Sequence, residues 1–96
     1  MTKEEFLVSL NKDKPSDTLS PLLKSLWWDK KGDWDRAHRI AQDIPTIDGS
    51  RVHAYLHRVE GDKWNANYWY SRAGTPYSSL SLNEEWESLI VAFLTY

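Results

Sequence analysis

The sequence predicts an all-α fold made of antiparallel helical hairpins with flanking helices, and two observations carry that prediction. A short pattern occurs twice, and Gly32 and Gly61 in its two copies lie 29 residues apart. Repetition at a period of roughly 20 to 50 residues is typical of stacked helix–turn–helix units. No segment alternates between apolar and polar residues for long enough to indicate a strand. We therefore expect about five or six helices and no sheet.

The first predicted hairpin spans residues 20–45. A Ser-Pro pair beginning at Ser20 is typical of a helix start, and Gly32 ends this helix. Asp33 is expected to cap the second helix, which Pro45 stops. Both helices have apolar stripes at helical spacing: Leu22, Leu23, Leu26 and Trp27 in the first, and Trp34, Ala37, Ala41 and Ile44 in the second.

The second predicted hairpin spans residues 50–74. We expect Asp48 or Ser50 to cap its first helix, which ends at Gly61. Asp62 is expected to cap its second helix, which a Gly-Thr-Pro sequence ends. The apolar stripes are Val52, Tyr55, Leu56 and Val59 in the first helix, and Ala66, Trp69, Tyr70 and Ala73 in the second.

Flanking helices are expected on both sides of the hairpins. Thr2 and Glu5 have the spacing of a capping box, and so do Ser81 and Glu84. The second box begins a closing helix over residues 82–95, with the apolar stripe Trp86, Leu89, Ile90 and Phe93.

Length and composition restrict the classes of function. The 96 residues indicate one domain, 1–96. The net charge of -2 gives no basic footprint for a nucleic-acid partner. The chain has no cysteine, which excludes disulfides and thiolate metal sites. Its first residues are too acidic, and their apolar run too short, for a signal peptide or a membrane span, so we expect a cytoplasmic protein without a membrane partner.

The repeated segment resembles the tetratricopeptide repeat and its close helical relatives. With Gly32 aligned on Gly61, Ala37 matches Ala66, and the run Gly-Asp-Lys-Trp-Asn-Ala-Asn-Tyr-Trp-Tyr-Ser-Arg-Ala looks especially like those relatives. The resemblance covers residues 20–76 and implies two hairpins whose helices pack closely through small side chains. The period of 29 is shorter than the ~34 residues of that repeat.

The second copy is also similar to small uncharacterised bacterial and fungal proteins. The shared pattern is His-Ala-Tyr-Leu-His-Arg, then Glu-Gly-Asp, Tyr-Trp-Tyr and Arg-Ala-Gly, and it begins here at His53. This similarity implies a fold family and no particular activity.

Three histidines form the only cluster with the chemistry of a metal site. His53 and His57 lie four residues apart on one predicted helix, which is the spacing of paired helical ligands. His38 on the preceding helix would supply a third imidazole, with Asp35 as its carboxylate partner. The alternative is that these histidines flank the apolar stripe and make ordinary hydrogen bonds there.

Aromatic and arginine residues suggest a recognition surface. The chain has six Trp, five Tyr and two Phe, which build either the core or the walls of a groove. Trp64 and Tyr68 are expected to face away from the Ala stripe of their helix, and Arg58 and Arg72 lie beside aromatic residues. The same arginines suit salt bridges and cation–π contacts between helices.

The leading functional hypothesis is therefore a non-enzymatic protein-interaction module that binds a protein partner or a second copy of itself. Its expected surface is Trp64, Tyr68, Arg58 and Arg72. The alternative is a metal-binding or small-ligand protein, with or without enzymatic activity, that uses His38, His53 and His57 with aromatic walls. No catalytic motif and no cofactor motif are found.

Overall fold

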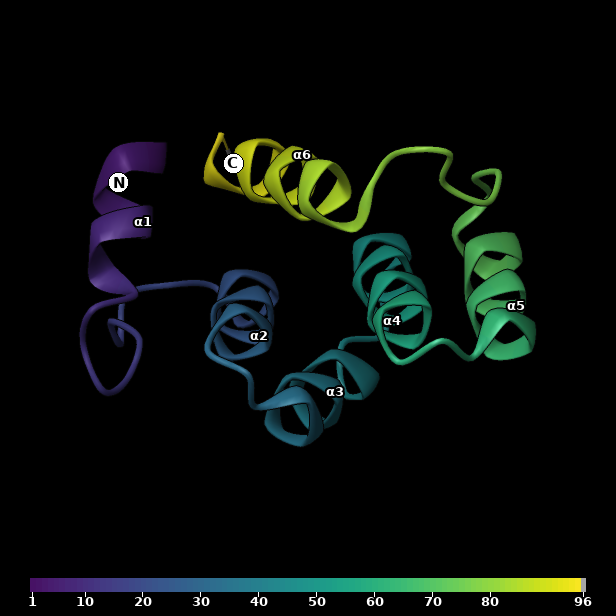
Figure 1. The fold of residues 1–96 in the computed structure, drawn as a ribbon, viewed down its shortest axis with the longest axis horizontal. Coiled ribbons are helices and arrows are strands. Elements are labelled where there is room, and N and C mark those ends of the chain that lie inside the picture. Colours follow the sequence, from purple (N-terminus) through teal and green to yellow (C-terminus); the bar gives the residue numbers. More distant parts are fainter. Residues whose placement is uncertain (96) are drawn as a thin grey trace.

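The structure is a computed structural model that describes residues 1–95, so the predicted domain 1–96 includes one residue outside the described range. Within that range there are six helices and no strand, which confirms the all-α prediction. The helices are α1 (Lys3–Ser9), α2 (Pro21–Lys30), α3 (Trp34–Gln42), α4 (Ile47–Val59), α5 (Lys63–Ala73) and α6 (Leu82–Leu94). Figure 1 shows α2 to α5 following one another across the molecule, with α6 passing above α2 and α4.

Helix starts follow the capping residues closely. The hydroxyls of Thr2 and Ser81 accept from backbone N–H groups in complete capping boxes, and Ser20 caps α2 in the same way. One cap differs from the expectation. Thr46, not Asp48 or Ser50, caps α4, because its hydroxyl accepts from the Gly49 N–H at 3.1 Å.

The repeated pattern forms the same turn twice. Gly32 and Gly61 both have positive φ, at 89° and 82°, which a glycine adopts without steric cost. In each turn the following aspartate N–H donates to a helix carbonyl at 2.9 Å, Asp33 to Trp28 and Asp62 to His57. The same aspartates then cap the next helix through their side chains. The chain therefore reverses in three residues, and each pair of helices packs as an antiparallel hairpin.

Small side chains lie where the hairpin helices cross. Ala37 in α3 and Ala66 in α5 are fully buried, and so is Ala54 in α4. Ser25 of α2 donates its hydroxyl to the Ala37 carbonyl at 2.7 Å. Because these positions have little bulk, the helix backbones approach closely and the neighbouring large rings fill the remaining space.

The main core lies between α2, α4 and α6. Trp27 and Trp86 are almost completely buried, and the Trp86 indole N–H donates to the Leu26 carbonyl at 2.9 Å. Phe6 brings α1 against Trp86, with ring centroids 6.0 Å apart. Figure 1 shows α1 at one end of the molecule and α5 at the other. None of the helices in residues 1–95 has the length and apolar character that a membrane crossing requires.

The turn between α3 and α4 is unusually tight. A Cβ added to Gly49 would lie 2.2 Å from the Ile44 carbonyl oxygen, so no larger residue fits without a backbone shift. This contact holds the end of α3 against the first turn of α4.

Candidate functional site

The three histidines of the chain meet between α3 and α4. His38 comes from α3, and His53 and His57 come from α4. One nitrogen of each ring lies within 4.8 Å of the others, and the Nε2 atoms of His38 and His53 are 2.9 Å apart. The ring centroids are separated by 4.6 to 5.1 Å. The structure therefore brings together all three residues that the sequence indicates as metal ligands.

Local structure explains this convergence. His53 and His57 are one helical turn apart, so their rings stack, with 22° between the planes. His38 is brought to them by the packing of α3 on α4. That packing includes a hydrogen bond at 2.7 Å, in which the Trp34 indole N–H donates to the Leu56 carbonyl.

Two tryptophans wall the cluster. The ring of Trp34 stacks on His38 with centroids 4.8 Å apart, and the ring of Trp69 stacks on His53 at 3.9 Å. Trp69 belongs to α5, so three successive helices contribute to the site. The aromatic walls expected for the metal alternative are thus Trp34 and Trp69, which the sequence assigned to core stripes.

Burial favours the neutral forms of His53 and His38. His53 and His57 are only 5% and 8% exposed, whereas His38 is partly exposed. Burial, together with the nearby His38 and His57, lowers the pKa of His53 to about 4. Burial also lowers the pKa of His38, aided by His57 and opposed by Glu60 and Asp35. At neutral pH both rings are therefore neutral, the form that binds a metal ion, and their Nε2 atoms share a hydrogen bond at 2.9 Å.

Glu60 orients His57. Its carboxylate accepts a hydrogen bond from His57 Nδ1 at 2.7 Å, so Nε2 is the nitrogen that remains for a ligand. Sequence reasoning missed Glu60, although it lies three residues after His57 on the same helical face. Asp35 makes no hydrogen bond to His38 in the described part of the chain; the Trp34 ring contacts His38 instead.

A second carboxylate lies beyond Glu60. Asp62 and Glu60 each have a carboxylate oxygen within 4.8 Å of a His57 nitrogen. Asp62 is also the cap of α5, and its carboxylate accepts from the N–H and the side-chain amide of Asn65. We therefore assign Asp62 to the helix end.

Three residues of the predicted interaction surface lie on the outer side of α5. Trp64 is 77% exposed and Tyr68 is 46% exposed, as their helical positions predict. The guanidinium carbon of Arg72 lies 5.9 Å from the centroid of the Tyr68 ring and 5.6 Å from that of Trp69. These three residues do not belong to the histidine cluster. Trp69 lies between the two sets, because its ring contacts His53 on one side and Tyr68 and Arg72 on the other.

Arg58 lies elsewhere and is engaged inside the molecule. Its Nη1 pairs with the buried Glu85 at 2.7 Å, and its Nη2 donates to the Leu80 carbonyl. The Tyr70 hydroxyl donates to the same carboxylate at 2.7 and 2.9 Å. Arg58 thus joins α4 to α6 and the segment that precedes α6.

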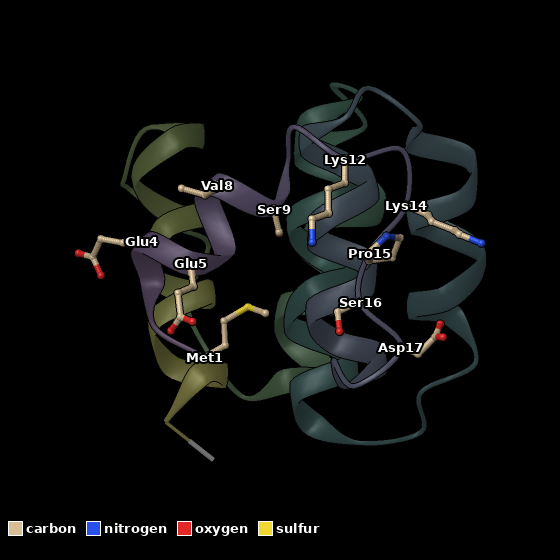
Figure 2. A pocket seen from close by; sticks show the side chains of 10 residues that line it. All are labelled: Met1, Glu4, Glu5, Val8, Ser9, Lys12, Lys14, Pro15, Ser16 and Asp17. Carbon is tan, nitrogen blue, oxygen red and sulfur yellow. The ribbon is translucent and has the colours of Figure 1, made fainter.

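A pocket lies far along the chain from the histidines. It has a volume of about 660 Å³ and lies between α1 and the connector that follows it (Figure 2). Acidic and basic side chains both line it, among them Glu5, Asp17 and Lys12, and no histidine does. The pocket therefore has no part in the chemistry of the cluster.

Comparisons of the chain with protein-family models, with curated proteins and with solved structures found no match in any of the three sets. The resemblance to tetratricopeptide repeats stays a prediction. The function proposed below depends on the fold and on the geometry of the side chains.

Proposed function

We propose that this protein binds a divalent transition metal ion through His38, His53 and His57. One observation carries the proposal: residues from two helices converge so that three imidazole nitrogens lie within 4.8 Å of one another. This convergence supports a metal site more strongly than the four-residue spacing of His53 and His57 on α4 does. His38 joins the cluster only because α3 packs against α4.

The geometry suits a metal with tetrahedral preference. Zinc binds imidazole nitrogen at about 2.0–2.1 Å, which places tetrahedral ligand nitrogens about 3.3 Å apart. The 2.9 Å between the Nε2 atoms of His38 and His53 and the 4.8 Å limit for the whole set lie on either side of that value. The 2.9 Å contact is a hydrogen bond in the metal-free protein, so a metal ion bound by both Nε2 atoms would displace the shared proton and separate the two nitrogens slightly.

The ligand set restricts the metal and its role. Neutral imidazoles suit zinc, copper and nickel, and the chain has no cysteine to favour softer ions. Three protein ligands leave a fourth position for water, as in zinc sites that activate water or bind a small ligand. No residue is assigned a catalytic role here.

Calorimetric titration of untagged protein with ZnCl₂ tests the proposal. We expect one ion per chain in the wild type and at least a tenfold loss of affinity in His38→Asn, since one of three ligands is removed. His38 is the partly exposed member of the cluster, so this variant is the one expected to keep its fold. Circular dichroism of the variant checks that it does.

Asp13→Asn is the matched control, because Asp13 is an exposed carboxylate in the connector after α1. It should bind zinc as the wild type does. Absence of zinc binding in the wild type, or equal affinity in a folded His38→Asn variant, would overturn the proposal. The protein-interaction role that the sequence predicts uses a different face and stays a prediction.

A further inference from the structure

The outer face of α5 presents aromatic and basic groups without acidic ones. Trp64, Tyr68 and Arg72 follow at intervals of four residues, so they form one stripe along the helix. The helix also contains Lys63 and has no Asp or Glu between Lys63 and Ala73, although the whole chain carries a net charge of -2. The Lys63 ammonium lies near the ring of Tyr77, so the stripe itself presents two aromatic rings and the guanidinium of Arg72.

Arg72 is held in place without a carboxylate partner. Its guanidinium lies over two rings, and its Nη1 donates to the Tyr68 hydroxyl at 3.4 Å. Within residues 1–95, Arg36, Arg51 and Arg58 each pair with a carboxylate, and Arg72 does not. An arginine fixed by aromatic rings with its charge uncompensated is well placed to bind an external carboxylate.

A cleft adjoins Arg72. It has a volume of about 320 Å³ and lies between α5 and the segment that joins α3 to α4. Apolar walls come from Ile44, Pro45 and Trp69, and Ile47 at its edge is 64% exposed. The volume is at the lower end of the range for small-molecule sites, roughly 300–1,000 Å³, and suits side chains of a docked segment better than a cofactor.

We infer that this face binds an acidic segment of a protein partner. A carboxylate of the segment pairs with Arg72, an adjacent apolar side chain enters the cleft, and Trp64 and Tyr68 extend the contact. The inference goes beyond metal binding and does not depend on it, because it uses neither the three imidazoles nor an ion. Charge complementarity selects the class of partner, because Arg72 is a cation on both the stripe and the cleft and no acidic residue lines the cleft.

Nuclear magnetic resonance titration in EDTA tests the inference without any metal. The probes are the peptide acetyl-Asp-Leu-Asp-Phe-amide and its uncharged form acetyl-Asn-Leu-Asn-Phe-amide. The signals followed are the indole N–H groups of Trp64 and Trp69 and the Nε–H of Arg72. We expect the acidic peptide to shift all three signals and to bind at least about fivefold more tightly than the uncharged one.

Two variants distinguish a specific effect of Arg72 from a general effect of removing one positive charge. Arg72→Gln should remove the preference for the acidic peptide. Arg39→Gln should retain it, because Arg39 is also exposed and donates to the Asp35 carbonyl, but lies on α3 away from this face. Trp64→Ser should weaken both peptides alike.

Three results would overturn the inference. These are the absence of shifts at the three signals, equal binding of the two peptides, and equal losses in Arg72→Gln and Arg39→Gln. None of them bears on zinc binding, which is measured separately.

Discussion

The hydrogen bond between His57 and Glu60 decides which imidazole nitrogen of His57 remains available. Nδ1 donates to the carboxylate at 2.7 Å, so the ring is held in one tautomer with Nε2 free. A carboxylate in this position also increases the basicity of the ligand nitrogen. Glu60 is exposed, so it performs this role without contributing much to the core.

Replacing Glu60 should therefore weaken the metal site without unfolding the protein. We expect Glu60→Gln to lower zinc affinity about tenfold, in line with other partners that orient ligating histidines. Calorimetric titration at pH 7.5 measures the effect, with Asp13→Asn as the control that keeps wild-type affinity. A Glu60→Gln variant that binds zinc as tightly as the wild type would show that the orientation of His57 does not matter.

The buried His53 predicts a pH dependence of stability in the metal-free protein. Its pKa is about 4 in the folded state and about 6.5 for an unperturbed histidine, so the unfolded chain binds more protons between these two values. The free energy of unfolding should then fall as the pH is lowered from 6.5 towards 4, and be unaffected by this group above about pH 7.5. At pH 5 we expect a loss of about 2 kcal/mol.

Urea denaturation in EDTA at pH 7.5 and pH 5 measures that loss. Histidines titrate in this window, whereas burial raises the pKa of Asp29 and opposes the loss, so comparison with a His53 variant isolates the imidazole. His53→Gln should lose most of the dependence and keep only a smaller part from His38. A variant as sensitive to pH as the wild type would assign the effect to other groups.

Residue spacing reveals part of this site. The i, i+4 pair of His53 and His57 can be read from the sequence because one helix places both rings on one face. The closeness of His38 cannot be read in this way, because it depends on how α3 crosses α4. Trp34 and Trp69 were assigned to core stripes, and their contact with the imidazoles follows only from the tertiary packing.

At the scale of helices, the ends of the elements decide where the histidines lie. The two Gly-Asp turns are visible in the sequence, and the structure shows them with nearly the same geometry. The start of α4 was harder to predict, since Thr46, Asp48 and Ser50 are all good capping residues. The structure shows that Thr46 is the cap, because its hydroxyl accepts from the Gly49 N–H at 3.1 Å.

Gly49→Ala tests that packing. The added methyl group would lie 2.2 Å from the Ile44 carbonyl oxygen and 2.8 Å from its side chain, so the backbone must move. We expect a loss of roughly 2–4 kcal/mol in the free energy of unfolding. Chemical denaturation gives the value, and the neighbouring half-buried Ser50→Ala should change it by less than about 1 kcal/mol. Similar values for the two variants would contradict the close approach.

Across the whole molecule, α6 closes the hairpins through a buried ion pair. Glu85 of α6 pairs with Arg58 of α4 and accepts from Tyr70 of α5, so one carboxylate joins three helices. The sequence did not reveal this role. Glu85 stands in the first turn of its helix, where an acidic residue is already favoured by the helix dipole, and its partners are 27 and 15 residues away.

Breaking this pair should be costly. Glu85→Gln leaves the Arg58 guanidinium largely buried without its counter-charge, and we expect a loss of about 3 kcal/mol in the free energy of unfolding. Glu87→Gln on the same helix is the matched control, because its pair with Lys3 is exposed and should contribute less than about 1 kcal/mol. Urea denaturation at pH 7.5 distinguishes them, and equal effects would refute a special role for Glu85.

X-ray absorption at the zinc edge measures whether the three histidines bind one metal ion together. The sample is untagged protein loaded with one equivalent of zinc. We predict a first shell that contains three imidazole nitrogens at about 2.0–2.1 Å, recognisable by the multiple scattering of the rings. A shell with one imidazole or none, made mainly of carboxylate and water oxygens, would contradict the account.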